Sequence, residues 1–197
     1  MDSNLIKIRH ERSKKDYPGL KLDDDEYVEY AFSRAKVCLW MILGSLAAGL
    51  ILILLAFLFV LLAQAKLDEM GKNFLFIILF ALLAAAVIIG IVAIRVFNGN
   101  KLYVTNKHII QYVMDSIVSS SINVIDLSMV EDASFKQENI LQQMFHYGTF
   151  RLSTVGDETT YTFKYSDISQ SDLRGVTEIL TAARKVTINK KHKTENS

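Results

Sequence analysis

The sequence predicts an α+β protein in which a two-helix transmembrane hairpin is followed by a small antiparallel β barrel or sandwich capped by a C-terminal helix. Three observations carry this prediction: two long apolar stretches, a series of segments with period-two alternation after them, and a final amphipathic segment. The chain has 197 residues and is 51% hydrophobic, and much of that hydrophobicity lies in the two stretches. The remaining residues suffice for one small folded domain.

The two apolar stretches, 37–63 and 74–94, contain no charged residue. As a helix the second spans about 31 Å, close to the roughly 30 Å of a bilayer's hydrocarbon core. The first spans about 40 Å, so it must tilt or extend beyond the core. Strands rarely exceed about ten residues, so both stretches are predicted to be helices. Two such stretches in tandem favour membrane spans over the buried helices of a soluble protein.

Basic residues around the two spans predict their topology. Lysine and arginine are more frequent before the first span and after the second than in the loop 64–73, where two lysines are offset by two acidic residues. The positive-inside rule then favours a multi-pass protein of the plasma (cytoplasmic) membrane with both termini cytoplasmic. The first span starts too late and is too long for a cleaved signal peptide.

Small residues recur four apart in both spans, a spacing that lets helix backbones approach closely. The predicted packing residues are Gly44, Ser45, Ala48 and Gly49 in the first span and Ala81, Ala85, Ala86 and Gly90 in the second. In an antiparallel pair, Gly49 and Ala85 come to similar depth, so we hypothesise that the two small patches face each other and close the hairpin. The alternative is that they face other subunits.

Residues 1–36 are interpreted as a cytoplasmic arm followed by the start of an interfacial helix. Segment 1–21 is polar and is expected to be mobile, with Leu5, Ile6 and Ile8 as an apolar cluster that would allow a short strand. Asp23 with Glu26 resembles a capping box, and aromatic and basic residues follow, so a helix is predicted from Asp23 into the first span. A metal site in the acidic run is disfavoured, because consecutive helical residues point about 100° apart.

After residue 97 the apolar pattern changes to period two. It predicts a β domain, 98–186, with a bulge between Val124 and Ile125 and a hairpin turn at 156–157. The predicted strands lie near 102–105, 109–114, 119–127, 129–136, 149–153 and 160–165. Helical spacing predicts a short helix over 140–145 and an amphipathic helix over 169–186, with a basic tail at 187–197. The apolar stripe of that last helix consists of Leu173, Val176, Leu180 and Ala183.

Two motifs resemble the bacterial pleckstrin-homology-like domain family, also called the membrane-flanked domain. Segment 101–110, KLYVTNKHII, resembles its opening hairpin, and segment 139–149, NILQQMFHYGT, resembles its later short helix and the strand start that follows. The order of elements over roughly 27–185 is similar to the small members with a two-helix hairpin. The resemblance implies a pleckstrin-homology-like fold and brings no catalytic or cofactor residue. The chain departs from the family at His108, where arginine is frequent.

The sequence predicts no catalytic, cofactor-binding or metal site. The four histidines have no Cys, Asp or Glu at ligand spacing, and no nucleophile triad, phosphate loop or dinucleotide fingerprint appears. A single cysteine, Cys38, excludes an internal disulfide. The net charge of +1 gives no global field that would steer the protein to nucleic acid.

We therefore expect a non-enzymatic integral membrane protein that presents a cytoplasmic pleckstrin-homology-like domain for binding or assembly at the membrane. Its expected partners are the lipid bilayer and other membrane proteins or a second copy. One alternative is an oligomeric transport or permeability component, although the spans lack the ionisable residues typical of ion pathways. The other is a lipid-headgroup sensor, with Lys101 and Lys107 as candidate contacts, although residues 95–185 hold nine basic and ten acidic residues.

Overall fold

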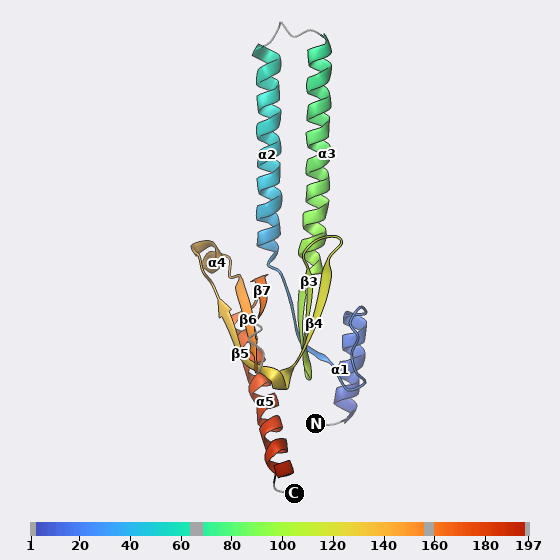
Figure 1. The fold of residues 1–197 in the computed structure, drawn as a ribbon, viewed down its shortest axis with the longest axis vertical. Helices are drawn as coiled ribbons and strands as arrows, with labels where there is room; N and C mark the ends of the chain where they lie inside the picture. Colours follow the sequence, from blue (N-terminus) through green and yellow to red (C-terminus); the bar gives the residue numbers. More distant parts are fainter. Residues whose placement is uncertain (1–2, 64–68, 156–159, 196–197) are drawn as a thin grey trace.

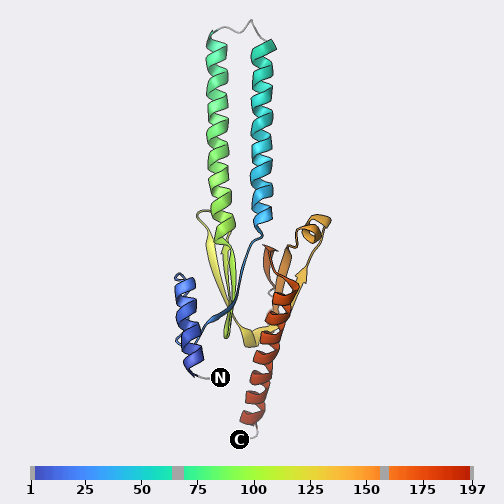
Figure 2. The same cartoon turned by 180° about the vertical axis from the view of Figure 1, so that it is seen from behind.

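The computed structural model describes residues 3–63, 69–155 and 160–195 and has the predicted α+β class. Two long helices, α2 (Lys36–Ala63) and α3 (Glu69–Gly99), stand side by side with a β domain at one end of them (Figure 1). Seen from either side, both chain termini lie at the β-domain end (Figure 2). Half of the predicted loop 64–73, residues 64–68, and the predicted 156–157 turn lie outside the described residues. The other half of that loop belongs to α3, which begins at Glu69.

The β domain contains two antiparallel sheets. The first has the order β1-β2-β3-β4 and the second β5-β6-β7. The strands of the first sheet are β1 (Val28–Ser33), β2 (Lys101–Thr105), β3 (His108–Met114) and β4 (Ser120–Asp126). Those of the second are β5 (Val130–Lys136), β6 (Gly148–Thr154) and β7 (Thr160–Ser166). The remaining elements are α1 (Ser3–Asp16), the 3₁₀ turn η1 (Leu127–Met129), α4 (Ile140–Met144) and α5 (Gln170–Glu195).

The hydrophobic core lies between the two sheets and is closed by α5. Alternate residues of the strands point inward, among them Leu102, Ile109 and Phe150, each at most 1% exposed. The predicted stripe of α5 packs on this core, with Val176 fully buried. Ser169 accepts a hydrogen bond from the Asp172 amide at 3.1 Å, which caps the helix as predicted. The helix continues to Glu195, through most of the segment expected to be a basic tail.

The segment before the first apolar stretch is a strand, where the sequence predicted a helix. Val28, Tyr30 and Phe32 alternate with polar or small residues, and Tyr30 and Phe32 pack on the core. β1 pairs with β2, so Ser33 lies opposite Lys101. The capping-box contact does form, because the Asp23 amide donates to Glu26 at 3.1 Å, but it closes a turn and no helix follows. Burial of alternate aromatic side chains therefore outweighs the local helix signal.

The predicted mobile arm also differs, because residues 3–16 form α1. Its buried residues are polar: His10 contacts the backbone oxygen of Glu26 at 2.5 Å, and the Ser13 hydroxyl accepts a hydrogen bond from the Val28 amide at 3.0 Å. Arg9 adds an ion pair with Glu29 at 3.1 Å. Polar contacts to β1 and to the turn before it thus hold α1, and an apolar periodicity could not have predicted them.

The bulge predicted in β4 is absent. Ile109 pairs with Ile125 and Ile110 with Val124 in one continuous register. The shift in apolar phase has another cause: Ile125 is buried in the core, whereas Ile122 and Val124 lie on the outer face and are more than half exposed.

A buried asparagine joins α3 to the sheet. The Asn100 side chain donates to the carbonyl oxygens of Val96 at 2.6 Å and Met114 at 3.0 Å, and it accepts from the Met114 amide at 3.2 Å. Asn100 is 2% exposed, so these bonds form in a low-dielectric environment where breaking them is costly. The orientation of α3 relative to β3 is therefore fixed by side-chain chemistry.

Candidate functional site

The strand topology gathers several connections at the end of the β domain where α2 begins and α3 ends, which we call the helix foot. β1 runs into α2, and α3 runs into β2. Because the strands are antiparallel, the β3–β4 turn and the β5–β6 connection with α4 come to the same end. Figure 1 shows the β3–β4 turn beside α3 and places α4 near the level where α2 begins.

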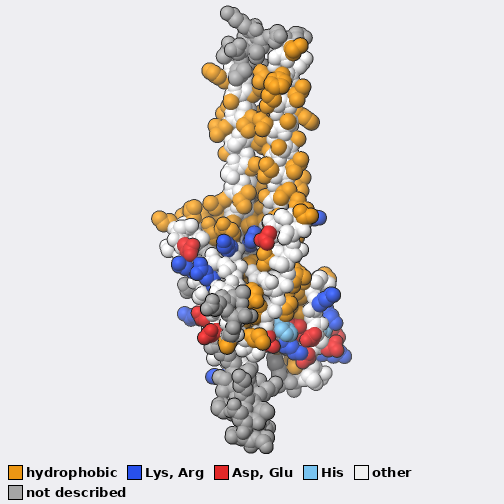
Figure 3. All heavy atoms as spheres, viewed as in Figure 1, with side chains coloured by type: hydrophobic (Ala, Val, Ile, Leu, Met, Phe, Trp, Pro, Cys, Tyr) orange, Lys and Arg blue, Asp and Glu red, His pale blue; other side chains and the backbone are white. Residues whose placement is uncertain are grey.

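Six exposed apolar side chains surround the helix foot, and we call them the apolar rim. The rim consists of Ile117, Val118, Ile140, Leu141, Met144 and Phe145. Val118 is 98% exposed and Ile140 is 79% exposed. In Figure 3, apolar side chains cover the visible surface of α2 and α3 and continue toward α4, whereas most charged side chains lie farther down on the β domain. The exposed apolar surface therefore extends from the helices onto the domain.

The two sheets meet at the helix foot through an isolated β-bridge between Arg34 and Ser166. The Ala35 amide donates to the Tyr165 carbonyl at 2.7 Å beside this bridge. Within the described residues, Arg34 Nε and Ser166 Oγ are buried without a hydrogen-bond partner. Buried polar atoms are almost always paired, so this pair of atoms marks an unusual site.

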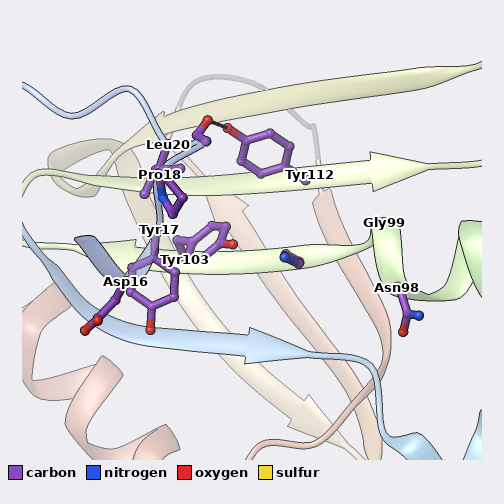
Figure 4. Close-up of a pocket in the computed structure, with 10 residues that line it drawn as sticks. Asp16, Tyr17, Pro18, Leu20, Asn98, Gly99, Tyr103 and Tyr112 are labelled. Carbon is purple, nitrogen blue, oxygen red and sulfur yellow. Dashed lines mark hydrogen bonds between the residues drawn. The ribbon is translucent and has the colours of Figure 1, made fainter. Parts of the chain in front are cut away.

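Lys101, a predicted headgroup contact, lies at the helix foot. It is exposed and lines a pocket of about 340 Å³ between the chain after α1 and the outer face of β2 and β3. Figure 4 shows Tyr17 and Leu20 from that chain facing Tyr103 and Tyr112. The Tyr17 and Tyr103 rings lie 5.2 Å apart, and the Tyr112 hydroxyl donates to the Gly19 carbonyl at 3.4 Å. This position is compatible with a contact between Lys101 and a lipid headgroup.

Lys107, the other predicted headgroup contact, lies at the opposite end of the same hairpin. β2 carries the chain away from α3 by about 3.3 Å per residue, so the β2–β3 turn is remote from the helix foot. There Lys107 pairs with Asp25 and lies 4.0 Å from Asp23. These contacts raise the pKa of Lys107, first through the hydrogen bond to Asp25. Its place in the fold favours a role in stabilising this turn over headgroup binding.

The acidic run binds the β2–β3 turn through a buried carboxylate. Glu26 is 2% exposed and accepts hydrogen bonds from the Thr105 hydroxyl at 2.5 Å and from His108 Nδ1 at 2.9 Å. Burial raises the pKa of Glu26, but these bonds and the Asp23 amide outweigh burial, so the pKa lies below its ordinary value of 4.5. The sequence contains no local signal for this cluster, because 82 residues separate Glu26 from His108.

The predicted packing residues of the two helices separate into three groups. Ala86 and Gly90 are buried between α2 and α3, and a Cβ at Gly90 would lie 3.5 Å from Leu46. Ser45, Gly49 and Ala85 line a groove along the same helix pair. The others are exposed on the single chain: Gly44, Ala48 and Ala81. Contacts between the two helices include Gly90 with Leu46 and the rings of Phe57 and Phe76, 5.6 Å apart. Gly49 and Ala85 line the same groove, and no atom lies within 4 Å of a Cβ placed at Gly49.

Replacing Gly90 with leucine is expected to separate α2 from α3, because the new side chain meets Leu46 and overpacking costs roughly 1–3 kcal/mol. The readout is an intrachain disulfide between Leu43→Cys and Ala93→Cys on a Cys38→Ser background, since both positions line the interhelical groove. Gly44→Leu is the matched control, because nothing lies within 4 Å of a Cβ at Gly44. Equal disulfide yields in the two variants would contradict the packing described here.

Comparisons with known proteins leave the family of this chain open. No family model matches it, and no curated protein matches it. A similar solved structure is that of a DUF1696 family protein with a pleckstrin-homology domain from Shewanella loihica PV-4, with a TM-score of 0.32 and 10% identity over 43% of this chain and 70% of that chain. The similarity is weak and partial, so the description of the β domain depends on its own strands and helices.

Proposed function

We propose that this chain is an integral membrane protein whose β domain, a pleckstrin-homology-like domain of the membrane-flanked family, lies on the cytoplasmic surface and serves binding or assembly there without catalysis. Both termini are then cytoplasmic. The family assignment is supported by the two sequence motifs, and the four-stranded and three-stranded sheets closed by α5 agree with it. The cytoplasmic side is supported by the distribution of lysine and arginine.

The observation that carries the membrane part of the proposal is the exposure of the two apolar helices. The candidate spans have mean hydropathies of 2.8 and 3.2, and only 0% and 11% of their most apolar windows are buried. Helices of this composition in a soluble core would be covered, and large exposed apolar surfaces mark interfaces with lipid or protein. The apolar rim extends this surface to the level at which the β domain begins.

The binding part of the proposal is supported by the outer edge of β4. Among the described residues, no strand pairs with this edge, and β4 contains no proline or lysine of the kind that usually protects edge strands. The β4 residues Ile122 and Val124, on the outer face of the strand, are 58% and 59% exposed. An edge strand of this kind accepts a strand from a partner by β-augmentation.

The first test is the depth of the apolar rim. We expect a fluorophore on Val118→Cys, in a Cys38→Ser full-length protein reconstituted in vesicles, to be quenched by lipids that carry a nitroxide near the headgroup. Asp24→Cys, an exposed position in the turn that contacts the β2–β3 turn, is the control and is expected to escape quenching. Equal quenching at both positions, or release of the protein from native membranes by alkaline carbonate, would contradict the membrane placement.

The second test addresses assembly. A photoreactive residue at Val124 is expected to form discrete adducts in native membranes, whereas the same residue at Lys164, an exposed position on β7, forms none. Adducts of twice the chain mass indicate self-association, and adducts that contain another membrane protein indicate a heterologous partner. Identical adduct patterns at the two positions would show that the β4 edge is not the binding surface.

A further inference from the structure

A pocket of about 230 Å³ lies at the helix foot between the two sheets and the start of α2. Its polar wall comes from Arg34, Tyr147 and Tyr165, and its apolar wall from Met41, Ile42 and Phe97. The pocket therefore combines one cation and two phenols with an apolar surface that belongs to the membrane-spanning helices.

Arg34 is half-buried and has no counter-charge of its own. Arg9, Arg12 and Arg151 each form an ion pair with a carboxylate, whereas no described carboxylate lies within ion-pair distance of Arg34. Its Nε is buried without a hydrogen-bond partner, and its guanidinium lies 5.9 Å from the centre of the Tyr165 ring. Burial lowers the pKa of Arg34, with Tyr165 and Asp115 acting at longer range in the opposite direction. Arginine nevertheless stays protonated in proteins, so this site carries a desolvated positive charge.

The backbone holds the pocket in this shape before any ligand arrives. Tyr165 has a φ of 60°, a left-handed conformation that bulky residues rarely adopt, and its carbonyl accepts the Ala35 amide at 2.7 Å. The bridge between Arg34 and Ser166 fixes the main chain on the other side. Tyr147 is 5% exposed and packs in a buried cluster with Ala35, Cys38 and Phe97. A strained residue that is held in place by its surroundings is typical of functional sites.

The position of the pocket relative to α2 indicates the kind of anion. Arg34 lies two residues before α2 begins, and Ile42 lies about 9 Å farther along the helix at 1.5 Å per residue. Met41 and Ile42 are 44% and 46% exposed. If α2 crosses the bilayer, the cation is at headgroup depth and the apolar wall is where acyl chains begin. A free phosphate would contact only the cation, whereas a phospholipid would contact both the cation and the apolar wall.

We propose that this pocket binds one phospholipid, with its phosphate against Arg34 and the start of an acyl chain against Met41 and Ile42. The inference rests on the proposed function, because it requires α2 to lie in the membrane. A guanidinium matches a phosphate with paired N–H donors, so the Arg34 side chain suits the phosphate of a phospholipid. The N-terminus of α2 adds a partial positive charge on the same side.

The test uses the full-length protein in detergent and three probes: short-chain phosphatidylglycerol, inorganic phosphate and short-chain diacylglycerol. We expect the first to bind, read as a rise in the thermal unfolding midpoint and as a retained mass in native mass spectrometry. Inorganic phosphate and diacylglycerol are expected to bind far more weakly. Equal binding of inorganic phosphate would make the pocket a free-anion site, and equal binding of diacylglycerol would remove the role of the phosphate; either result overturns the proposal.

Two variants and a control assign the binding to this pocket. Arg34→Gln is expected to weaken phosphatidylglycerol binding at least about tenfold, as loss of a charged hydrogen-bonding partner does. Met41→Trp, which fills the apolar wall and leaves Arg34 intact, is expected to do the same. Arg95→Gln, at an exposed arginine near the end of α3, is expected to change nothing.

The outcomes separate the two proposals. A protein that alkaline carbonate releases from membranes fails the proposed function. If the protein stays in membranes but wild type, Arg34→Gln and Met41→Trp all bind phosphatidylglycerol equally well, only this inference fails. If Arg34→Gln does not fold, Met41→Trp and the wild-type probe series decide the outcome.

Discussion

Replacing Phe150 with alanine is expected to lower the free energy of unfolding of the β domain by about 3–5 kcal/mol, the range observed for buried aromatic residues. Phe150 is 1% exposed and lies opposite Phe135 on one neighbouring strand and Phe163 on the other. Truncation of Phe150 leaves a cavity in the second sheet between Phe135 and Phe163. A domain of this size has roughly 5–15 kcal/mol of stability, so the variant is expected to be close to unfolding.

The measurement for Phe150→Ala is pulse proteolysis of the full chain in detergent across a urea series, which reports the β domain while α2 and α3 stay in the micelle. Phe145→Ala is the matched control, because Phe145 belongs to the apolar rim and is 42% exposed. We expect the control to leave the urea midpoint nearly unchanged. A comparable loss in both variants would mean that the rim packs against protein.

Replacing Glu26 with glutamine is expected to lower the free energy of unfolding by about 2–3 kcal/mol, because charged hydrogen bonds are lost and buried donors are left without an equal partner. The Thr105 hydroxyl, His108 Nδ1 and the Asp23 amide all converge on this carboxylate. Asp24→Asn, at an exposed acid of the same turn, is the control and is expected to have little effect.

The same carboxylate predicts a pH dependence. The pKa of Glu26 is lower in the folded protein than its ordinary value of 4.5, so the folded state binds fewer protons than the unfolded state in this range. The contribution of Glu26 is therefore complete above pH 4.5 and is lost as the pH falls through the lowered pKa. The charged or titratable neighbours are Asp23, Asp25, His10, Lys107, His108 and Asp126.

Unfolding midpoints of wild type and Glu26→Gln, measured between pH 7 and pH 3, check this prediction. The difference between the two proteins is expected to shrink on acidification, because the neighbours titrate in both and only wild type carries the carboxylate. A difference that stays constant to pH 3 would show that Glu26 acts through its shape and not through its charge.

The sequence predicts most of the β domain because apolar residues recur with period two along its strands. Alternation locates β2, β3, β6 and β7 within a few residues, and the Ser169 cap with the stripe through Val176 locates the start of α5. The apolar composition of α2 and α3 likewise predicts two long helices from the sequence. In these segments the local pattern and the tertiary environment favour the same structure.

The elements that the sequence misses depend on partners far away in the chain. β1 carries its alternation over only six residues and adjoins an apolar span, so the local pattern of aromatic residues favours an interfacial helix. α1 docks through His10 and Ser13, whose bonds to the backbone leave no periodic signal. In the sequence, Arg34 is one of the basic residues that precede the first apolar span. Only the fold shows that its Nε is enclosed and unpartnered.

The place of β1 has a consequence for how this protein can be divided. Since β1 precedes α2 and pairs with β2, whose first residue follows α3, segment 35–99 amounts to a long insertion between two adjacent strands of one hairpin. A fragment that starts at residue 98 loses Phe32 from the core and uncovers the edge of β2. A water-soluble version should instead retain residues 3–34 and connect Arg34 to Asn100 by a tight two-residue turn, because Ser33 and Lys101 already lie opposite each other.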